Sequence, residues 1–178
     1  NLIDRDFGGI VPVAENPSNE DRALIEQVQD SYGKVGTLIE KGKLSAALKA
    51  VMDSIASANK YIVDEKPWDE SVLASGRAKE VIGTLAIFIE NANKLMYPFV
   101  PHASQRVYEA FGGEGTIAPM PRHAESSSQQ GVLTGDYERG ATWQFSTEWQ
   151  GRQLTDGKAT IFNKFKLEDI IQAFNDLD

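Results

Sequence analysis

The sequence predicts an all-α protein: an up-and-down helix bundle of four or five helices, with a loop-rich C-terminal tail and a final short helix. Two observations predict this class. Apolar residues recur at steps of three and four along most of residues 20–111, which is the spacing of one face of an α-helix. Proline or glycine stands where each of these stretches stops, as is common at helix ends.

The first long helix is predicted to begin at Asn19, as an N-cap ahead of two acidic residues, and to end at Gly42. Before it, the sequence of residues 7–9 and two prolines predict the end of an element and then an extended linker. The apolar stripe of this helix consists of Leu24, Val28, Tyr32, Val35 and Ile39.

Three further helices follow the same rhythm. The second is predicted over Leu44–Val63 and is stopped by Pro67. The third is predicted to run from Asp69 to Tyr97, and a shorter fourth one from Pro101 to Phe111.

Residues 113–160 differ in character, because they hold glycine, proline and serine with little helical period. The alternation from Trp143 to Trp149 predicts an extended or strand-like segment. A last amphipathic helix is predicted over 167–177. We therefore expect a bundle core at 1–112, a loop-rich insertion packed on it at 113–160, and a C-terminal segment of the same domain at 161–178.

Composition and motifs argue against chemistry in this stretch. The chain has 178 residues, of which 41% are hydrophobic and 25% charged, and it has no cysteine. We therefore expect a globular domain in a reducing cytoplasm, with no leader peptide and no membrane partner. His102 and His123 are the two histidines, and no phosphate-binding glycine loop occurs. We expect no catalytic residue, no metal and no cofactor here.

The net charge of −8 argues against nucleic-acid binding, since such proteins usually carry a basic surface. However, residues 43–68 hold four lysines against Asp53, Asp64 and Glu65, so the charge is locally positive. A domain attached to a larger RNA enzyme need not be basic overall.

The informative tract is residues 58–68. Trp68 follows Pro67, which fixes its own φ and restricts the residue before it, so the ring is held on a stiff corner. An unstacked RNA base can lie on such a ring while Lys60 and Lys66 attract phosphates. On the residues alone, Trp68 can equally be a packing residue that holds the loop to the bundle. Asn59 can likewise satisfy buried backbone groups.

Four landmarks in this chain resemble the anticodon-binding domain of methionyl-tRNA synthetases. The family's helix carries Ala-Asn-x-Tyr-(Ile/Val), a short spacer and Pro-Trp, which match residues 58–68. Residues 8–12 resemble its linker after the first helix, and residues 96–102 its Pro-Phe-(Leu/Val)-Pro-His corner. Residues 161–164 resemble its closing segment, although Thr160 stands in place of the usual proline.

The resemblance implies tRNA anticodon recognition, with Trp68 stacking on the anticodon of methionine tRNA and with Asn59, Lys60 and Lys66 beside it. It implies a parent ligase that joins methionine to tRNA using ATP and magnesium, with the catalytic domain as a second partner and no role for DNA. The catalytic signatures of that ligase are absent here. The family's Asn and Arg pair on its first helix falls before residue 1 in this register, so we expect the fragment by itself to bind tRNA poorly.

Two alternatives remain. One is the anticodon-binding domain of a related synthetase, such as the isoleucyl, valyl, leucyl or cysteinyl enzyme. The other is a helical interaction module without an RNA role, which the acidity would suit.

Overall fold

A computed structural model describes residues 2–115, 117 and 143–155. In these residues the helices are α1 (Leu2–Phe7), α2 (Asn19–Glu40), α3 (Leu44–Glu65), α4 (Glu70–Ala74), α5 (Arg77–Met96) and α6 (Pro101–Ala110). The prediction of an all-α fold is confirmed. The expected helix at 167–177 and the closing segment at 161–164 lie outside the described residues.

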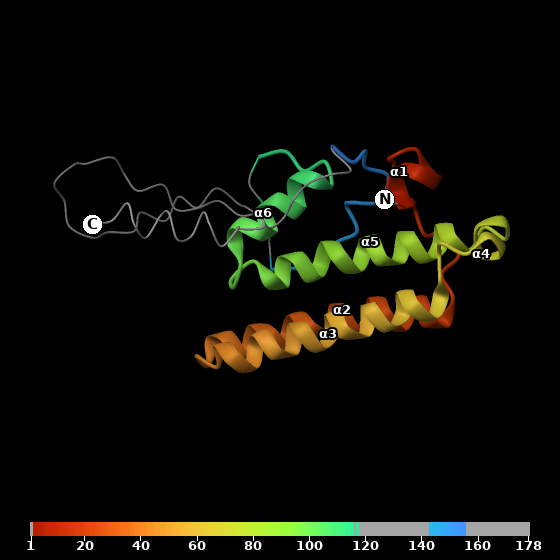
Figure 1. The fold of residues 1–178 in the computed structure, drawn as a ribbon. Coiled ribbons are helices and arrows are strands. Elements are labelled where there is room, and N and C mark those ends of the chain that lie inside the picture. Colours follow the sequence, from red (N-terminus) through yellow and green to blue (C-terminus); the bar gives the residue numbers. More distant parts are fainter. Residues whose placement is uncertain (1, 116, 118–142, 156–178) are drawn as a thin grey trace, which may run out of the picture.

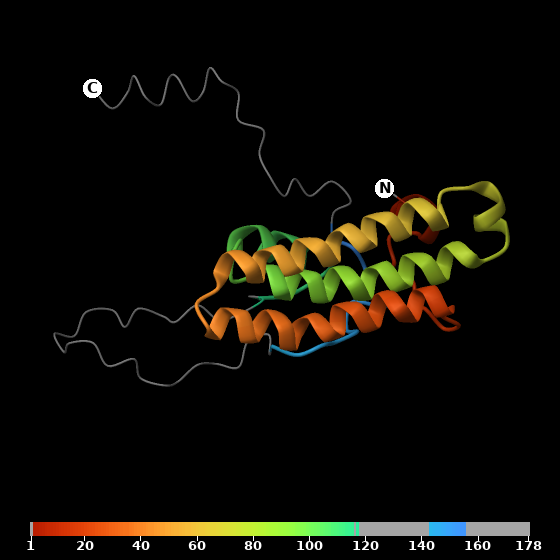
Figure 2. The ribbon, with the colours of Figure 1, turned by 90° about the horizontal axis from the view of Figure 1, so that it is seen from below.

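The long helices α2, α3 and α5 form an antiparallel three-helix bundle, and each contacts the other two (Figures 1 and 2). The short α6 packs against α5, and α4 lies near the start of α5. No described helix combines the length and the apolar content that crossing a bilayer requires. The core draws on all three long helices, with Val28, Tyr32, Val35, Ala47, Val51, Ala58, Tyr61, Val81, Leu85, Phe88 and Leu95 among its buried residues.

Several predicted helix boundaries differ from the structure by one or two residues, and two of these differences have a clear physical reason. The N-cap of α2 is Ser18 and not Asn19, because Ser18 and Asp21 form a capping box in which each side chain accepts from the other's backbone N–H. The end of α3 is Glu65, two residues beyond the prediction, because Lys66 adopts the left-handed conformation that stops the helix before Pro67.

The predicted third helix at 69–97 is two helices. Gly76 has a φ of 79°, in the left-handed region that glycine tolerates best, and this breaks the helical path between α4 and α5. Asp69 caps α4 through its side chain, which accepts from the backbone N–H of Ser71. The apolar rhythm continues through the break, so periodicity did not reveal it.

Residues 143–155, which we call the return segment, are irregular, and the strand-like prediction was wrong. In the described part of this segment the backbone bonds partly to α5 side chains and partly to the backbone of residues 9–11. Ser146 N–H donates to Asn91 Oδ1 (3.0 Å) and Trp149 N–H to Glu90 Oε2 (3.0 Å), while Val11 N–H donates to the Arg152 carbonyl (2.9 Å). An isolated bridge joins Gln153 to Ile10.

The return segment also carries two tryptophans onto the bundle. The ring of Trp149 is buried and stacks on Phe111 with centroids 4.6 Å apart. Trp143 lies edge-on to Tyr32, and its Nε1–H donates to the Tyr32 carbonyl (3.2 Å). The division of the chain at 112/113 and 160/161 stays a prediction.

The linker that precedes α2 lies directly on α5, at Gly83. A Cβ at this position would come within 2.7 Å of the backbone nitrogen of Ala14 and 3.0 Å of the Pro12 carbonyl, so glycine is what allows this approach. The predicted extended linker therefore runs across the bundle surface.

Candidate nucleic-acid interface

The residues singled out from the sequence gather at one end of the bundle, where α3 gives way to α5. We call residues 66–76, which join these two helices and include α4, the corner. Trp68 stands on the corner with 46% of its surface exposed, and Pro67 beside it is buried. A flat aromatic face that is partly open to solvent, next to a buried proline, is the arrangement that base stacking needs.

Lys66 begins the corner in a strained conformation. Its φ of 44° puts it in the left-handed region, although it is not a glycine. In this conformation Lys66 is the C-cap of α3. A non-glycine residue persists there only when its surroundings fix the backbone. The Lys66 side chain is exposed, so its ammonium group is available to a phosphate.

Asn59 and Lys60 lie in the last two turns of α3, and both are exposed. The exposure of Asn59 is evidence against the alternative that its amide satisfies buried backbone groups. Asn59 shares its helix face with Val63, one turn on, and Val63 is also exposed. The four predicted site residues thus occupy the end of one helix and the turn that follows it.

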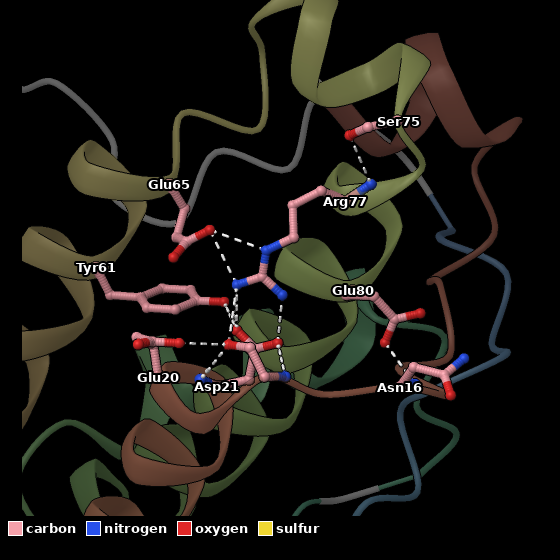
Figure 3. A network of polar contacts seen from close by, with 9 residues as sticks. Asn16, Glu20, Asp21, Tyr61, Glu65, Ser75, Arg77 and Glu80 are labelled. Carbon is pink, nitrogen blue, oxygen red and sulfur yellow. Dashed lines mark hydrogen bonds and ion pairs between the residues drawn. The ribbon is translucent and has the colours of Figure 1, made fainter.

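Behind the corner lies a cluster of polar side chains that was not expected from the sequence (Figure 3). We call Ser18, Asp21, Tyr61, Glu65 and Arg77 the helix-end cluster. It joins the first turn of α2, the last turns of α3 and the first residue of α5.

Asp21 is the centre of this cluster and is fully buried. Arg77 donates to both of its carboxylate oxygens, from Nη1 to Oδ2 (2.5 Å) and from Nη2 to Oδ1 (2.7 Å). The Tyr61 hydroxyl also donates to Oδ1, and the Ser18 backbone N–H donates to Oδ2 (2.8 Å). A buried carboxylate is stable in a protein when its charge is paired and its lone pairs are occupied in this way.

These contacts set the ionisation of the cluster. Burial pushes the pKa of Asp21 upward, but the hydrogen bonds from Arg77, Tyr61 and Ser18 outweigh it, so the pKa lies below its ordinary value. Burial, reinforced by the bond to Asp21, raises the pKa of the Tyr61 hydroxyl. The bond to Asp21 raises the pKa of Arg77. At neutral pH the cluster therefore holds an ionised Asp21, a neutral Tyr61 and a charged Arg77.

Arg77 uses the other edge of its guanidinium for Glu65. Its Nε–H donates to Glu65 Oε2 (2.9 Å), and Nη2 lies 2.9 Å from the same oxygen. Glu65 is the last residue of α3 and Arg77 the first of α5, so this ion pair joins the two ends of the corner.

Part of the helix-end cluster had a signal in the sequence. Ser18 and Asp21 are spaced as a capping box, a pattern that marks a helix start. Tyr61 lies in the informative tract, but nothing there indicated its partner 40 residues earlier. Arg77 had no signal, because its role depends on how three helix ends converge.

The side chains near the corner also bear on whether a metal ion could bind in this region. Among the residues that the structure describes, no group of three or more His, Cys, Asp or Glu side chains could hold a metal ion.

Comparisons with known proteins agree on one family. Residues 21–148 match the family model described as the anticodon-binding domain of tRNA ligase. A methionine–tRNA ligase of Bifidobacterium longum is 37% identical over 186 aligned residues, which cover 96% of this chain and 29% of that protein. A methionine–tRNA ligase of Bifidobacterium animalis is 38% identical over 79% of this chain. The chain thus spans less than a third of the length of these relatives.

Solved structures show the same fold. The free-state methionyl-tRNA synthetase of Mycobacterium tuberculosis superposes with a TM-score of 0.68 at 18% identity, over 93% of this chain and 30% of that one. The same enzyme bound by methionyl-adenylate gives a TM-score of 0.59 at 21% identity, over 62% of this chain.

Proposed function

We propose a function on one premise: this chain belongs to the anticodon-binding domain family of tRNA ligases. Because its curated relatives are methionine–tRNA ligases, we propose that the domain serves such a ligase and binds the anticodon loop of methionine tRNA. Its role is to position the tRNA and to add specificity, while the chemistry takes place in the catalytic domain of the same enzyme.

The observation that carries this proposal is the exposed Trp68 on a corner with a buried proline. Loop bases of RNA are recognised when they are unstacked from one another and stacked on an aromatic side chain. The Trp68 ring offers that surface. Asn59 supplies a donor and an acceptor for a base edge, and Lys60 and Lys66 supply positive charge for the phosphates.

The parent ligase would use ATP and magnesium to activate methionine. We assign both to the catalytic domain of that enzyme. The cytoplasm is the proposed location of this reaction, and neither a membrane nor DNA takes part.

The test is a titration of the full-length ligase with methionine tRNA, comparing wild type with Trp68→Ala and Trp68→Phe. Loss of one stacked base costs about 1–3 kcal/mol, so Trp68→Ala weakens binding by about five- to 150-fold. Trp68→Phe keeps a ring and retains most of the affinity. Trp143→Ala is the matched control, because Trp143 is also partly exposed but lies on the return segment.

Two results would overturn the proposal. One is unchanged tRNA affinity in a folded Trp68→Ala variant. The other is an interaction that does not weaken with added salt, since contacts with phosphates release counterions. A salt-independent interaction with a protein would favour the module without an RNA role, which the net charge of −8 suits. Titration with isoleucine, valine, leucine and cysteine tRNAs separates the related synthetases.

A further inference from the structure

The corner contacts the bundle through the buried Pro67 and through α4, but its hydrogen bonds hold it only at its two ends. Within the described residues, the hydrogen bonds of 66–76 run to other residues of the corner or to the helix turns that flank it, such as Lys66 N–H to the Ile62 carbonyl (3.1 Å) and Asp69 N–H to the Lys66 carbonyl (2.9 Å). None of the residues of α4 is buried. The place of Trp68 therefore depends on how the base of the corner is held.

The base of the corner is held by the ion pair of Glu65 with Arg77 (2.9 Å). Arg77 is itself fixed, because its other edge is bonded to both oxygens of the buried Asp21. The Arg77 guanidinium thus fixes the end of α3 and the start of α5 against the same buried carboxylate, to which Tyr61 bonds the preceding turn of α3 directly (Figure 3). A lysine in place of Arg77 could not make both contacts, since it lacks the planar fork.

We propose that Glu65 and Arg77 are positioning residues for RNA recognition: their ion pair closes the base of the corner and so sets where the Trp68 indole meets the tRNA. This inference rests on the proposed function. Neither residue needs to contact RNA, because both act through the backbone that carries Lys66, Pro67 and Trp68. We therefore expect variants of this ion pair to bind tRNA more weakly while the three-helix bundle stays folded.

Glu65→Ala is the informative variant. Arg77 variants leave the buried carboxylate of Asp21 without its partner, which threatens folding. Glu65 is partly exposed, so its removal opens the corner while the pairing of Asp21 with Arg77 remains. Glu65→Gln keeps an oxygen that accepts from Arg77 Nε, so we expect this variant to keep most of the tRNA affinity that Glu65→Ala loses.

Asp64→Ala is the matched control. Asp64 is the adjacent acid on α3, it is exposed, and its side chain has no hydrogen-bond or ion-pair partner in the described part of the chain. Both alanine variants remove one negative charge beside the proposed RNA site. They differ in that Glu65→Ala also breaks the closure of the corner.

The experiment measures aminoacylation by the full-length ligase. We expect Glu65→Ala to raise KM for methionine tRNA by about threefold or more, with the rate of methionine activation unchanged. Asp64→Ala leaves KM unchanged or lowers it, since it removes a charge that repels phosphates. In the Trp68→Ala background, Glu65→Ala adds no further loss, because the ring that it positions is gone.

A spectroscopic readout tests the position of the ring directly. With fluorinated tryptophan incorporated into the full-length ligase, the signals of Trp68, Trp143 and Trp149 are assigned by single Trp→Phe variants. The Trp68 signal shifts or broadens in Glu65→Ala, while it is unchanged in Asp64→Ala and the Trp149 signal is unchanged in both.

The outcomes separate the two proposals. If Trp68→Ala weakens tRNA binding and Glu65→Ala changes neither KM nor the Trp68 signal, the positioning role is wrong and the proposed function stands. If Glu65→Ala and Trp68→Ala weaken binding additively, Glu65 acts elsewhere and the positioning role is again wrong. If Trp68→Ala has no effect on tRNA binding, the proposed function is wrong and this inference is overturned with it.

Discussion

The corner carries one tryptophan, Trp68, and the return segment carries two, of which Trp149 differs most from Trp68 in its burial. Trp68 on the corner is 46% exposed, whereas Trp149 on the return segment is 1% exposed. Each region is tied to the bundle through a fully buried carboxylate, Asp21 for the corner and Glu90 for the return segment.

The difference lies in where the anchoring bonds fall. Glu90 accepts from the backbone N–H of Trp149 and from the hydroxyl of Ser146, so the return segment is held along its length. Asp21 is linked to the base of the corner through Arg77 and Glu65, and through Tyr61 in the last turns of α3. The stretch that Glu90 anchors directly buries the Trp149 ring, whereas the corner, whose hydrogen bonds lie at its ends, leaves the Trp68 ring open to solvent.

The largest effect that tests this comparison concerns stability. Trp149→Ala lowers the free energy of unfolding by about 3–5 kcal/mol, because it removes a buried ring stacked on Phe111. Trp68→Ala changes the same quantity by less than about 1 kcal/mol, since its ring is half open to solvent. Urea unfolding followed by circular dichroism measures both. Equal losses would show that Trp68 is a packing residue.

The second effect concerns the buried charge below the corner. Asp21→Asn lowers the free energy of unfolding at neutral pH by about 3–5 kcal/mol, because it removes the buried carboxylate that Arg77 pairs with and leaves that side chain only Glu65. The folded-state pKa of Asp21 lies below its ordinary value, so this contribution is present above the unfolded pKa of about 3.9 and is lost as the pH falls through the folded pKa.

The difference in the free energy of unfolding between wild type and Asp21→Asn therefore becomes smaller as the pH falls below about 4. Urea unfolding across that range measures it. Asp30→Asn is the control, because Asp30 is exposed on the same helix. If this difference in the free energy of unfolding stays constant at every pH below about 4, the role given to the Asp21 charge is wrong.

The smallest effect concerns the strained start of the corner. Lys66→Gly raises the free energy of unfolding relative to Lys66→Ala by up to about 1 kcal/mol, because glycine accepts a φ of 44° without the Cβ clash that alanine keeps. Both variants lack the ammonium group, so both weaken tRNA binding to the same degree. Thermal unfolding ranks the pair. An alanine variant at least as stable as the glycine one would mean that this backbone carries no strain.

The long helices were predictable because their apolar residues recur with the period of a helix, and α2, α3 and α5 follow that rule. The predicted N-cap, Asn19, is one residue too late, because Ser18 and Asn19 are both polar residues that can cap a helix and both precede its apolar stripe. The break at Gly76 was missed because apolar residues continue on both sides of it.

The exposed part of the candidate site was predictable and the buried part was not. A proline followed by tryptophan at a helix end pointed to Trp68, and the structure leaves that ring open. Arg77 meets Asp21 across 56 residues, and Ser146 meets Glu90 across the same separation. Charged residues at such separations look like ordinary surface residues in the sequence, because their burial follows from how the helices converge.

The closure of the corner at its base has a consequence for how this protein can vary. Because Glu65 and Arg77 meet directly, the two ends of the corner are joined by a contact that does not involve residues 68–76, whereas Pro67 is buried. We therefore expect residues 68–76 to be the part of the corner that can be exchanged. A corner from another member of the family, grafted between these two side chains, would bring its own aromatic platform onto an unaltered scaffold.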